Sequence, residues 1–192
     1  MATQPSLFPF CESHALPDGF SYFDEAISPD DEKHLLTRLA ELQFTNFQFR
    51  GFEGRRRVVS FCWRYDFNSH KVLAAEPIPP FLFGTYRKVQ ASSGLFLRNL
   101  QQVLVTEYAP GAPIGWHRDR PVFDEIMGLS LASPCLFRLR KSLGNGKWER
   151  ITIPLAPRSV YFLKGTVRRE WEHSIPPVEA VRYSITFRNV LV

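Results

Sequence analysis

The sequence predicts a mostly β protein in which helices pack outside a double-sheet core. Its 17 Phe, 6 Tyr and 4 Trp residues favour strands, because aromatic side chains suit half-buried pleated surfaces. The 15 Pro and 11 Gly residues indicate many short elements joined by tight turns. From Gln101 onward, short apolar runs alternate with Pro and Gly at the spacing of an antiparallel sandwich or barrel.

The length of the chain predicts a single domain. With 192 residues, of which 44% are hydrophobic, the chain is long enough for one full core and short for two. We expect one domain over residues 1–192, with an N-terminal extension over about residues 1–100 and a core over about residues 101–192. No internal repeat or low-complexity tract divides it.

Two helices are predicted in the first half. In residues 28–42, Ser28 is a natural N-cap, Pro29 takes the first helical position and leucines follow at helical spacing. Residues 77–94 open with prolines and end at Gly94, a residue typical of a helix C-terminus. Both helices are expected to cover the β core from outside.

Residues 55–67, with the sequence RRRVVSFCWRYDF, predict one extended strand. Alternate side chains of a strand point the same way, which places four aromatic residues on one face. These residues are Phe61, Trp63, Tyr65 and Phe67. The face is either the buried side of a structural strand or an exposed aromatic surface, and the sequence leaves both interpretations open.

The second half contains the predicted strands of the core. They are QQVLVTEY (101–108), GLSLAS (128–133), CLFRLRK (135–141), ITIPL (151–155), SVYFLKG (159–165) and RYSITFRNVLV (182–192). Asn145 and Gly146 supply a two-residue hairpin turn between two of them. Short connections of this kind favour antiparallel neighbours.

Composition narrows the function classes. A formal charge of +5 and a pI near 9.3 are compatible with nucleic-acid binding without establishing it. The cysteines Cys11, Cys62 and Cys135 show no C-x-x-C spacing, so structural zinc is not expected. So few cysteines fit a reducing compartment, and we expect a cytoplasmic location, or also a nuclear one in a eukaryote. Without a signal peptide or an apolar run of roughly 20 residues, we expect no membrane partner. A basic single domain of this size is expected to be a monomer.

The stretch GWHRDRP places His117 two residues before Asp119. In an extended segment these side chains point the same way and offer two adjacent metal ligands, although an ordinary turn can carry the same triplet by chance. His173, from a distant strand, would complete the two-His-one-carboxylate face of non-haem Fe(II) oxygenases. The other histidines are weaker candidates: His14, His34 and His70.

The last predicted strand carries Arg182, Ser184, Thr186 and Arg188 on one face. At about 3.3 Å per residue the arginine Cα atoms stand roughly 20 Å apart, so inward-leaning side chains can hold the two ends of a dicarboxylate. The alternative is an antiparallel strand whose polar face is solvated.

Together, VTEYAPGAPIGWHRD, GTVRREWEHSI and RYSITFR resemble the AlkB family of Fe(II)- and 2-oxoglutarate-dependent dioxygenases. That family has an Asn-x-Tyr motif, then H-x-D, a distal His and finally R-x-N-x-T-x-R. The resemblance covers residues 103–190 and includes the order and spacing of the motifs.

The resemblance implies a role for each matching residue. It makes His117, Asp119 and His173 the catalytic iron ligands. Tyr108 and Arg182 would hold the distal carboxylate of 2-oxoglutarate, with Arg188 near its other carboxylate and Thr186 at the family's threonine. Thr106 and Ser184 depart from the family pattern, because each stands where an Asn is usual and has a shorter reach without an amide.

The resemblance also implies a double-stranded β-helix, or jelly roll, with the iron in its mouth. The cofactors would be Fe(II), 2-oxoglutarate as cosubstrate, and O2. The reaction would convert 2-oxoglutarate to succinate and CO2 while an N-alkyl carbon of the substrate is hydroxylated and then lost as an aldehyde.

Alkylated DNA or RNA is the expected partner. In AlkB-like enzymes a nucleotide-recognition lid precedes the catalytic core, and residues 55–67 occupy that region. Phosphates would meet Arg55, Arg56 and Arg57, and an extruded base would stack on Trp63 or Tyr65. Two other hypotheses remain open, namely a dioxygenase that acts on a protein side chain or small molecule, and a catalytically weak binding module.

Overall fold

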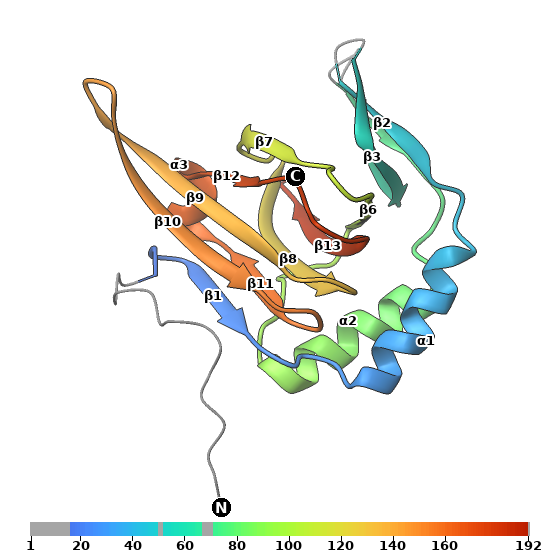
Figure 1. Cartoon of the computed structure of the whole chain (residues 1–192). Coiled ribbons are helices and arrows are strands. Elements are labelled where there is room, and N and C mark those ends of the chain that lie inside the picture. Colours follow the sequence, from blue (N-terminus) through green and yellow to red (C-terminus); the bar gives the residue numbers. More distant parts are fainter. Residues whose placement is uncertain (1–15, 50–51, 67–70, 192) are drawn as a thin grey trace, which may run out of the picture.

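The computed structural model describes residues 16–49, 52–66 and 71–191 (Figure 1). Its helices are α1 (Pro29–Ala40), α2 (Pro80–Ser93) and α3 (Gly165–Glu170). Its strands are β1 (Phe20–Phe23), β2 (Thr45–Phe49), β3 (Phe52–Phe61), β4 (Trp63–Asp66), β5 (Lys71–Ala74), β6 (Gln102–Tyr108), β7 (Ile114–His117), β8 (Phe123–Leu131), β9 (Cys135–Gly144), β10 (Lys147–Leu155), β11 (Val160–Leu163), β12 (Glu172–Ile175) and β13 (Arg182–Val190). Four residues of the sequence analysis lie outside the described ranges: Cys11, His14, Phe67 and His70.

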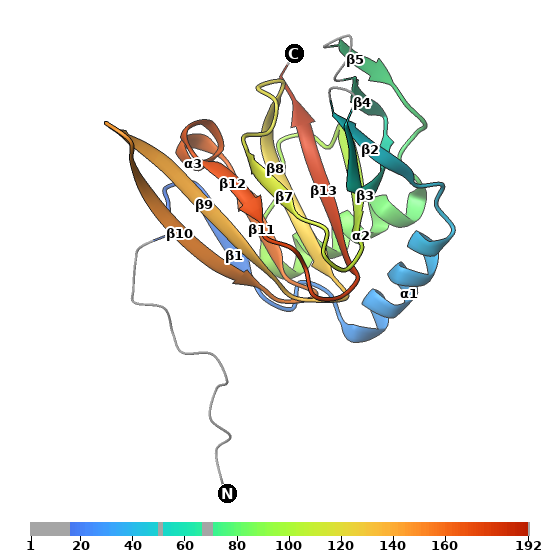
Figure 2. The same cartoon turned by 45° about the horizontal axis from the view of Figure 1, so that its top comes forward.

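Two antiparallel sheets make up the body of the protein. The larger has the order β1-β11-β8-β13-β6-β3-β2, and the smaller has the order β10-β9-β12-β7. Figure 2 shows the smaller sheet lying across one face of the larger. This arrangement confirms the predicted mostly β fold with a jelly-roll core and flanking helices.

Helices α1 and α2 cover the outer face of the larger sheet (Figure 1). Leu39 of α1 and Leu82 of α2 are fully buried, in one cluster with Val105 of β6 and Ile185 of β13. Both predicted helices are confirmed: the Ser28 hydroxyl accepts the Asp31 amide at 3.1 Å, and α2 ends at Gly94 with φ 68°. Neither these helices nor α3 is long and apolar enough to cross a membrane.

Three strands of the N-terminal half belong to the larger sheet, together with strands of the C-terminal half. Strand β1 pairs with β11, and β3 pairs with β6 along Arg56–Phe61. The region around residue 100 therefore joins two parts of one sheet.

The single strand predicted over residues 55–67 is wrong. The strand ends at Cys62, whose φ is 61°. The chain continues as β4, which pairs with β5 in a separate two-stranded sheet. Phe61 before the break is buried in the core beneath the helices, whereas Trp63 after it is 40% exposed. The aromatic alternation therefore does not form one face.

The C-terminal strand does not have the solvated polar face that was one of its two interpretations. Arg182, Ser184, Thr186 and Arg188 are all at least 93% buried, so the polar face of β13 is not solvated. Strand β13 lies in the middle of the larger sheet, with helices behind it and the smaller sheet in front. Its polar residues therefore face the interior of the roll.

Candidate active site

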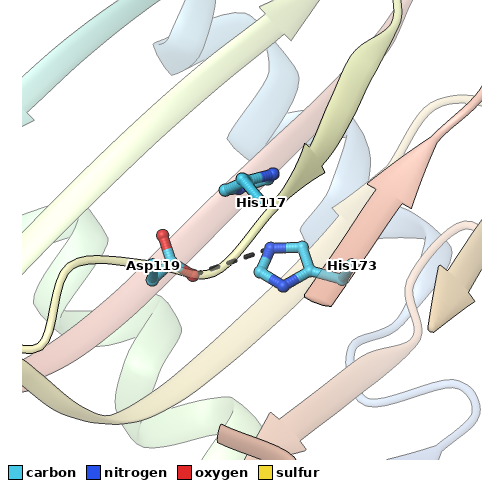
Figure 3. Close-up of side chains that lie close together, drawn as sticks. All are labelled: His117, Asp119 and His173. Atoms are coloured by element: carbon cyan, nitrogen blue, oxygen red, sulfur yellow. Dashed lines mark ion pairs between the residues drawn. The ribbon is translucent and has the colours of Figure 1, made fainter. Parts of the chain in front are cut away.

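Three side chains with metal-binding atoms meet between the sheets. His117 ends β7, Asp119 follows it in the next loop, and His173 lies opposite His117 in the pairing of β7 with β12. One ligand atom from each lies within 4.8 Å of the other two (Figure 3). The structure thus brings together the three predicted ligands. His34 lies on the exposed face of α1, outside this cluster.

Backbone and ring contacts orient the two imidazoles. His117 Nδ1 lies 2.9 Å from the carbonyl oxygen of Gly115, so a proton on Nδ1 leaves Nε2 free to bind a metal. The ring of His173 stacks on Phe137, with centroids 5.2 Å apart, and its centroid is 4.2 Å from that of His117. Both rings are therefore held before any ion arrives.

The electrostatics favour a charged Asp119 and a neutral His173. Burial opposes ionisation of Asp119, but Arg188 at 3.0 Å outweighs it, together with nearby histidines and Arg168, and the pKa of Asp119 falls below its ordinary value. Burial and the neighbouring His117 lower the pKa of His173 to about 3. The 3.7 Å contact of His173 with Asp119, dashed in Figure 3, therefore joins a neutral ring to a carboxylate, as metal binding requires.

Arg168 fixes the loop that carries Asp119. Its Nη2 donates to the carbonyl oxygens of Asp119, Arg120 and Phe123 at 3.1, 2.6 and 2.6 Å. The side chain is 6% exposed on α3, so it does not belong to a surface that could track a nucleic-acid backbone.

A second part of the site lies at Arg182. This arginine is fully buried, donates to Ser130 Oγ at 3.1 Å and lies 5.0 Å from the ring centre of Tyr108. Its Nε and Nη1 have no hydrogen-bond partner among the described residues, and neither does Nε of Arg188. Buried guanidinium groups that lack partners fit a dicarboxylate ligand.

The two positions that depart from the AlkB pattern are direct neighbours. Thr106 on β6 is the register partner of Ser184 on β13, which in turn faces Ser130 on β8. Three short hydroxyl side chains thus form a row across the sheet beside Arg182. Thr186 lies two residues further along β13, opposite Gly128.

Tyr161 and Cys135 are interior residues that the sequence analysis did not select. Burial raises the pKa of Tyr161, whose hydroxyl lies among Asp119, Tyr108 and the two arginines of β13. Burial also raises the pKa of the Cys135 thiol, against the opposing effect of Arg182. Only the alternation of Tyr161 with two core residues in VYFL marked it as facing the other way.

The three arginines of β3 have different environments. Arg57 donates to both carboxylate oxygens of Glu107 at 2.8 and 2.9 Å, and Arg55 is exposed. Arg56 points to the interior, because it is the register partner of Tyr108. Its guanidinium lies 3.9 Å from the ring centre of Phe47. The triplet therefore does not act as one patch.

Strand β4 brings an aromatic residue to the loop that carries Asp119. The guanidinium of Arg120, the next residue of that loop, lies 4.8 Å from the ring centre of Tyr65. Trp63, on the same strand, is 40% exposed. The structure thus places Tyr65 against Arg120 and Trp63 at the surface.

The remaining basic residues of the predicted strands are largely paired. Arg140 is bound to Glu172 at 2.6 Å and lies over the rings of Trp116 and Trp148. Arg138 donates to Ser174, and Lys141 pairs with Glu170. Each of these three basic residues is thus held by a side chain of the same protein.

Comparisons with known proteins agree with this geometry. The sequence profile of the 2OG-Fe(II) oxygenase superfamily matches residues 19–188. A relative of 30% identity, "Uncharacterized protein L905" of Acanthamoeba polyphaga mimivirus, aligns over 91% of this chain and 86% of its own. The tRNA (carboxymethyluridine(34)-5-O)-methyltransferase ALKBH8 of Mus musculus is 28% identical over 93% of this chain, which spans only 27% of that protein.

A further sequence relative and a solved structure agree with these matches. The mitochondrial alpha-ketoglutarate-dependent dioxygenase alkB homolog 7 of Bos taurus is 36% identical over 46% of this chain and 41% of its own. The solved structure of OsALKBH1 superposes with a TM-score of 0.67 at 15% identity, over 92% of this chain and 99% of that one. With a profile match over most of its length, the chain belongs to the 2OG-Fe(II) oxygenase superfamily, as an AlkB-like dioxygenase that uses Fe(II), 2-oxoglutarate and O2.

Proposed function

We propose that this dioxygenase removes alkyl groups from the nitrogen atoms of nucleic-acid bases. The observation that carries the proposal is the position of β3 and β4: β3 brings Arg56 beside Tyr108, and β4 brings Tyr65 to Arg120, the residue after Asp119. Such side chains bind phosphates and stack on bases. Two relatives are named for actions on nucleic acids, which supports a nucleic-acid substrate: one is a tRNA methyltransferase and the other, from Arabidopsis thaliana, an alkylated DNA repair protein homolog.

In this proposal His117, Asp119 and His173 hold Fe(II). When bound, Fe(II) with 2-oxoglutarate and O2 supplies the oxidation that hydroxylates the alkyl carbon. The protein contributes orientation: Gly115 holds His117, and Arg188 holds Asp119 at 3.0 Å. Three protein ligands leave the remaining positions open for cosubstrate and O2.

Tyr108 and Arg182 would hold the distal carboxylate of 2-oxoglutarate. Arg182 is already fixed by Ser130 and offers Nε and Nη1, which have no partner among the described residues. Thr106, Ser184 and Thr186 would contribute hydroxyl groups along the pocket, and Arg188 would lie near the other carboxylate. Burial of these groups excludes water from the cosubstrate.

The phosphate backbone would pass outside the roll. A surface pocket of about 360 Å³ is lined by Asn46, Gly54, Arg55, Arg57, Glu107 and Ala109. Arg55 is exposed there, whereas Arg57 already pairs with Glu107. Arg55 is therefore the residue of the triplet that we expect to contact phosphate.

The test is turnover of Fe(II)-loaded protein with 2-oxoglutarate, with and without methylated single-stranded oligonucleotides, following succinate and formaldehyde. Formaldehyde that appears only with the methylated oligonucleotide supports the proposal. Succinate without formaldehyde would assign the enzyme to a protein or small-molecule substrate. Neither product from protein that binds iron would make it a binding module.

A further inference from the structure

Arg56 places a positive charge on the inner face of the larger sheet. Its neighbours in sequence face outward, but Arg56 lies beside Tyr108, which lies beside Arg182 on the next strand. Its guanidinium interacts with the Tyr108 hydroxyl and feels the charge of Asp119, while Phe47 covers it at 3.9 Å. An arginine remains charged in such a place.

The charges of the loaded site do not cancel. Fe(II) and the 2-oxoglutarate dianion neutralise each other, and histidines bind a metal ion in their neutral form. The carboxylate ligand Asp119 offsets one of four arginines in this region, the buried Arg168, Arg182 and Arg188 and the half-buried Arg56. Three positive charges therefore remain in an interior where charges act strongly on one another.

Arg182 and Arg188 suffice for the two carboxylates of the cosubstrate, at the two ends of the polar face of β13. Arg56 is on a different strand, on the far side of Tyr108 from Arg182. Its charge is therefore not required by either carboxylate of the cosubstrate.

We propose that Arg56 determines substrate specificity, and that it makes the site select neutral modified bases, whose carbonyl oxygens its guanidinium binds, over cationic alkylated bases. The inference rests on the proposed function, because it presupposes a base as substrate. Selection has an attractive part, the hydrogen bonds to a carbonyl, and a repulsive part, the like charge.

Two pyrimidines give a matched pair of probes. Methylation at N3 makes cytosine a cation at neutral pH but leaves uracil neutral, and the two bases otherwise differ only at C4, where uracil carries a carbonyl oxygen. Both release formaldehyde when the methyl group is hydroxylated. Any difference between them therefore reports charge and hydrogen bonding.

The experiment compares kcat/KM of the Fe(II)-loaded enzyme for single-stranded oligonucleotides that contain 3-methyluracil or 3-methylcytosine. It also measures their Kd anaerobically, with 2-oxoglutarate bound. We expect the wild type to favour 3-methyluracil by about tenfold or more in both quantities, as one like charge nearby would produce. Arg56→Gln should reduce this ratio to about twofold, and Arg56→Lys should keep most of it.

Arg55→Gln is the matched control, because it removes the same charge from the exposed side of β3. It should weaken both oligonucleotides equally and leave their ratio unchanged. A wild type that favours 3-methylcytosine, or an Arg56→Gln ratio equal to that of the wild type, would overturn the inference alone. If Arg56→Gln instead weakens 2-oxoglutarate binding with the base preference unchanged, Arg56 is a cosubstrate contact and the inference is also wrong. Succinate production without formaldehyde from either oligonucleotide would refute the proposed function itself.

Discussion

The ring of Tyr161 lies directly across Gly128, its register partner on the neighbouring strand. A Cβ at residue 128 would stand 2.2 Å from Cζ of Tyr161 and 2.5 Å from its hydroxyl oxygen. The absence of a side chain on Gly128 therefore lets the Tyr161 hydroxyl reach the interior, between the arginines of β13.

Replacing Gly128 with Ala should displace this ring. We expect a loss of about 1–3 kcal/mol in the free energy of unfolding, as for other overpacked cores, and weaker binding of 2-oxoglutarate. Chemical denaturation and calorimetric titration measure the two effects. Gly84→Ala is the control, since a Cβ there meets nothing within 4 Å and an exposed helix gains stability from alanine. Equal stability of the two variants would contradict this account.

Arg168 should support the metal centre without touching it. Arg168→Ala removes the donor to three loop carbonyls and should cost about 1.5–3 kcal/mol of stability. Because Asp119 lies in that loop, iron affinity should fall as well, by a larger factor than in Arg169→Ala, whose side chain is exposed. Iron titration of both variants, at a temperature where both are folded, separates the two effects. Unchanged iron affinity in Arg168→Ala would show that the loop is held by other contacts.

Arg188 should set the pH range of metal binding. It holds the pKa of Asp119 below its ordinary value, and only the ionised carboxylate binds the metal. Removing the charge in Arg188→Met raises that pKa, so iron should be released at a higher pH as the solution is acidified. Iron retention measured against pH checks the direction. Arg188→Lys should fall between the two, and a variant profile that matches the wild type would remove Arg188 from this role.

The N-cap of α1 should affect stability alone. Ser28→Ala removes the acceptor of the Asp31 amide and should cost about 1 kcal/mol. The helix covers the outer face of the sheet, away from the interior residues, so kcat and KM for 2-oxoglutarate should stay at wild-type values. A change in KM would mean that the helix and the site are coupled.

Local patterns in the sequence predicted the parts of the molecule that depend on neighbouring residues. Ser28 and Pro29 predicted the start of α1, and Gly94 predicted the end of α2. The spacing of His117 and Asp119 predicted a pair of ligands, because two residues along an extended chain restore the same direction. The structure brings those side chains together with His173.

Features that depend on packing between distant segments could not be predicted from the sequence. The alternation of aromatic residues continues through Cys62 in the sequence. No local pattern predicted that Cys62 has a positive φ or that the chain enters another sheet after it. Burial of Arg182 and Arg168 requires carbonyls and hydroxyls from other strands, so their sequence neighbours could not reveal it. Arg56 was grouped with two outward-facing arginines, because only the pairing with Tyr108 shows its direction.

The measurement that tests the central claim most directly is iron binding by equilibrium dialysis, under anaerobic conditions, in the wild type and in His117→Ala, Asp119→Ala and His173→Ala. The account predicts about one Fe(II) per chain in the wild type and a loss of binding in each variant, while Arg182→Met keeps its iron and loses affinity for 2-oxoglutarate. Wild-type iron binding in all three ligand variants would contradict it, because the metal would then lie elsewhere in the protein.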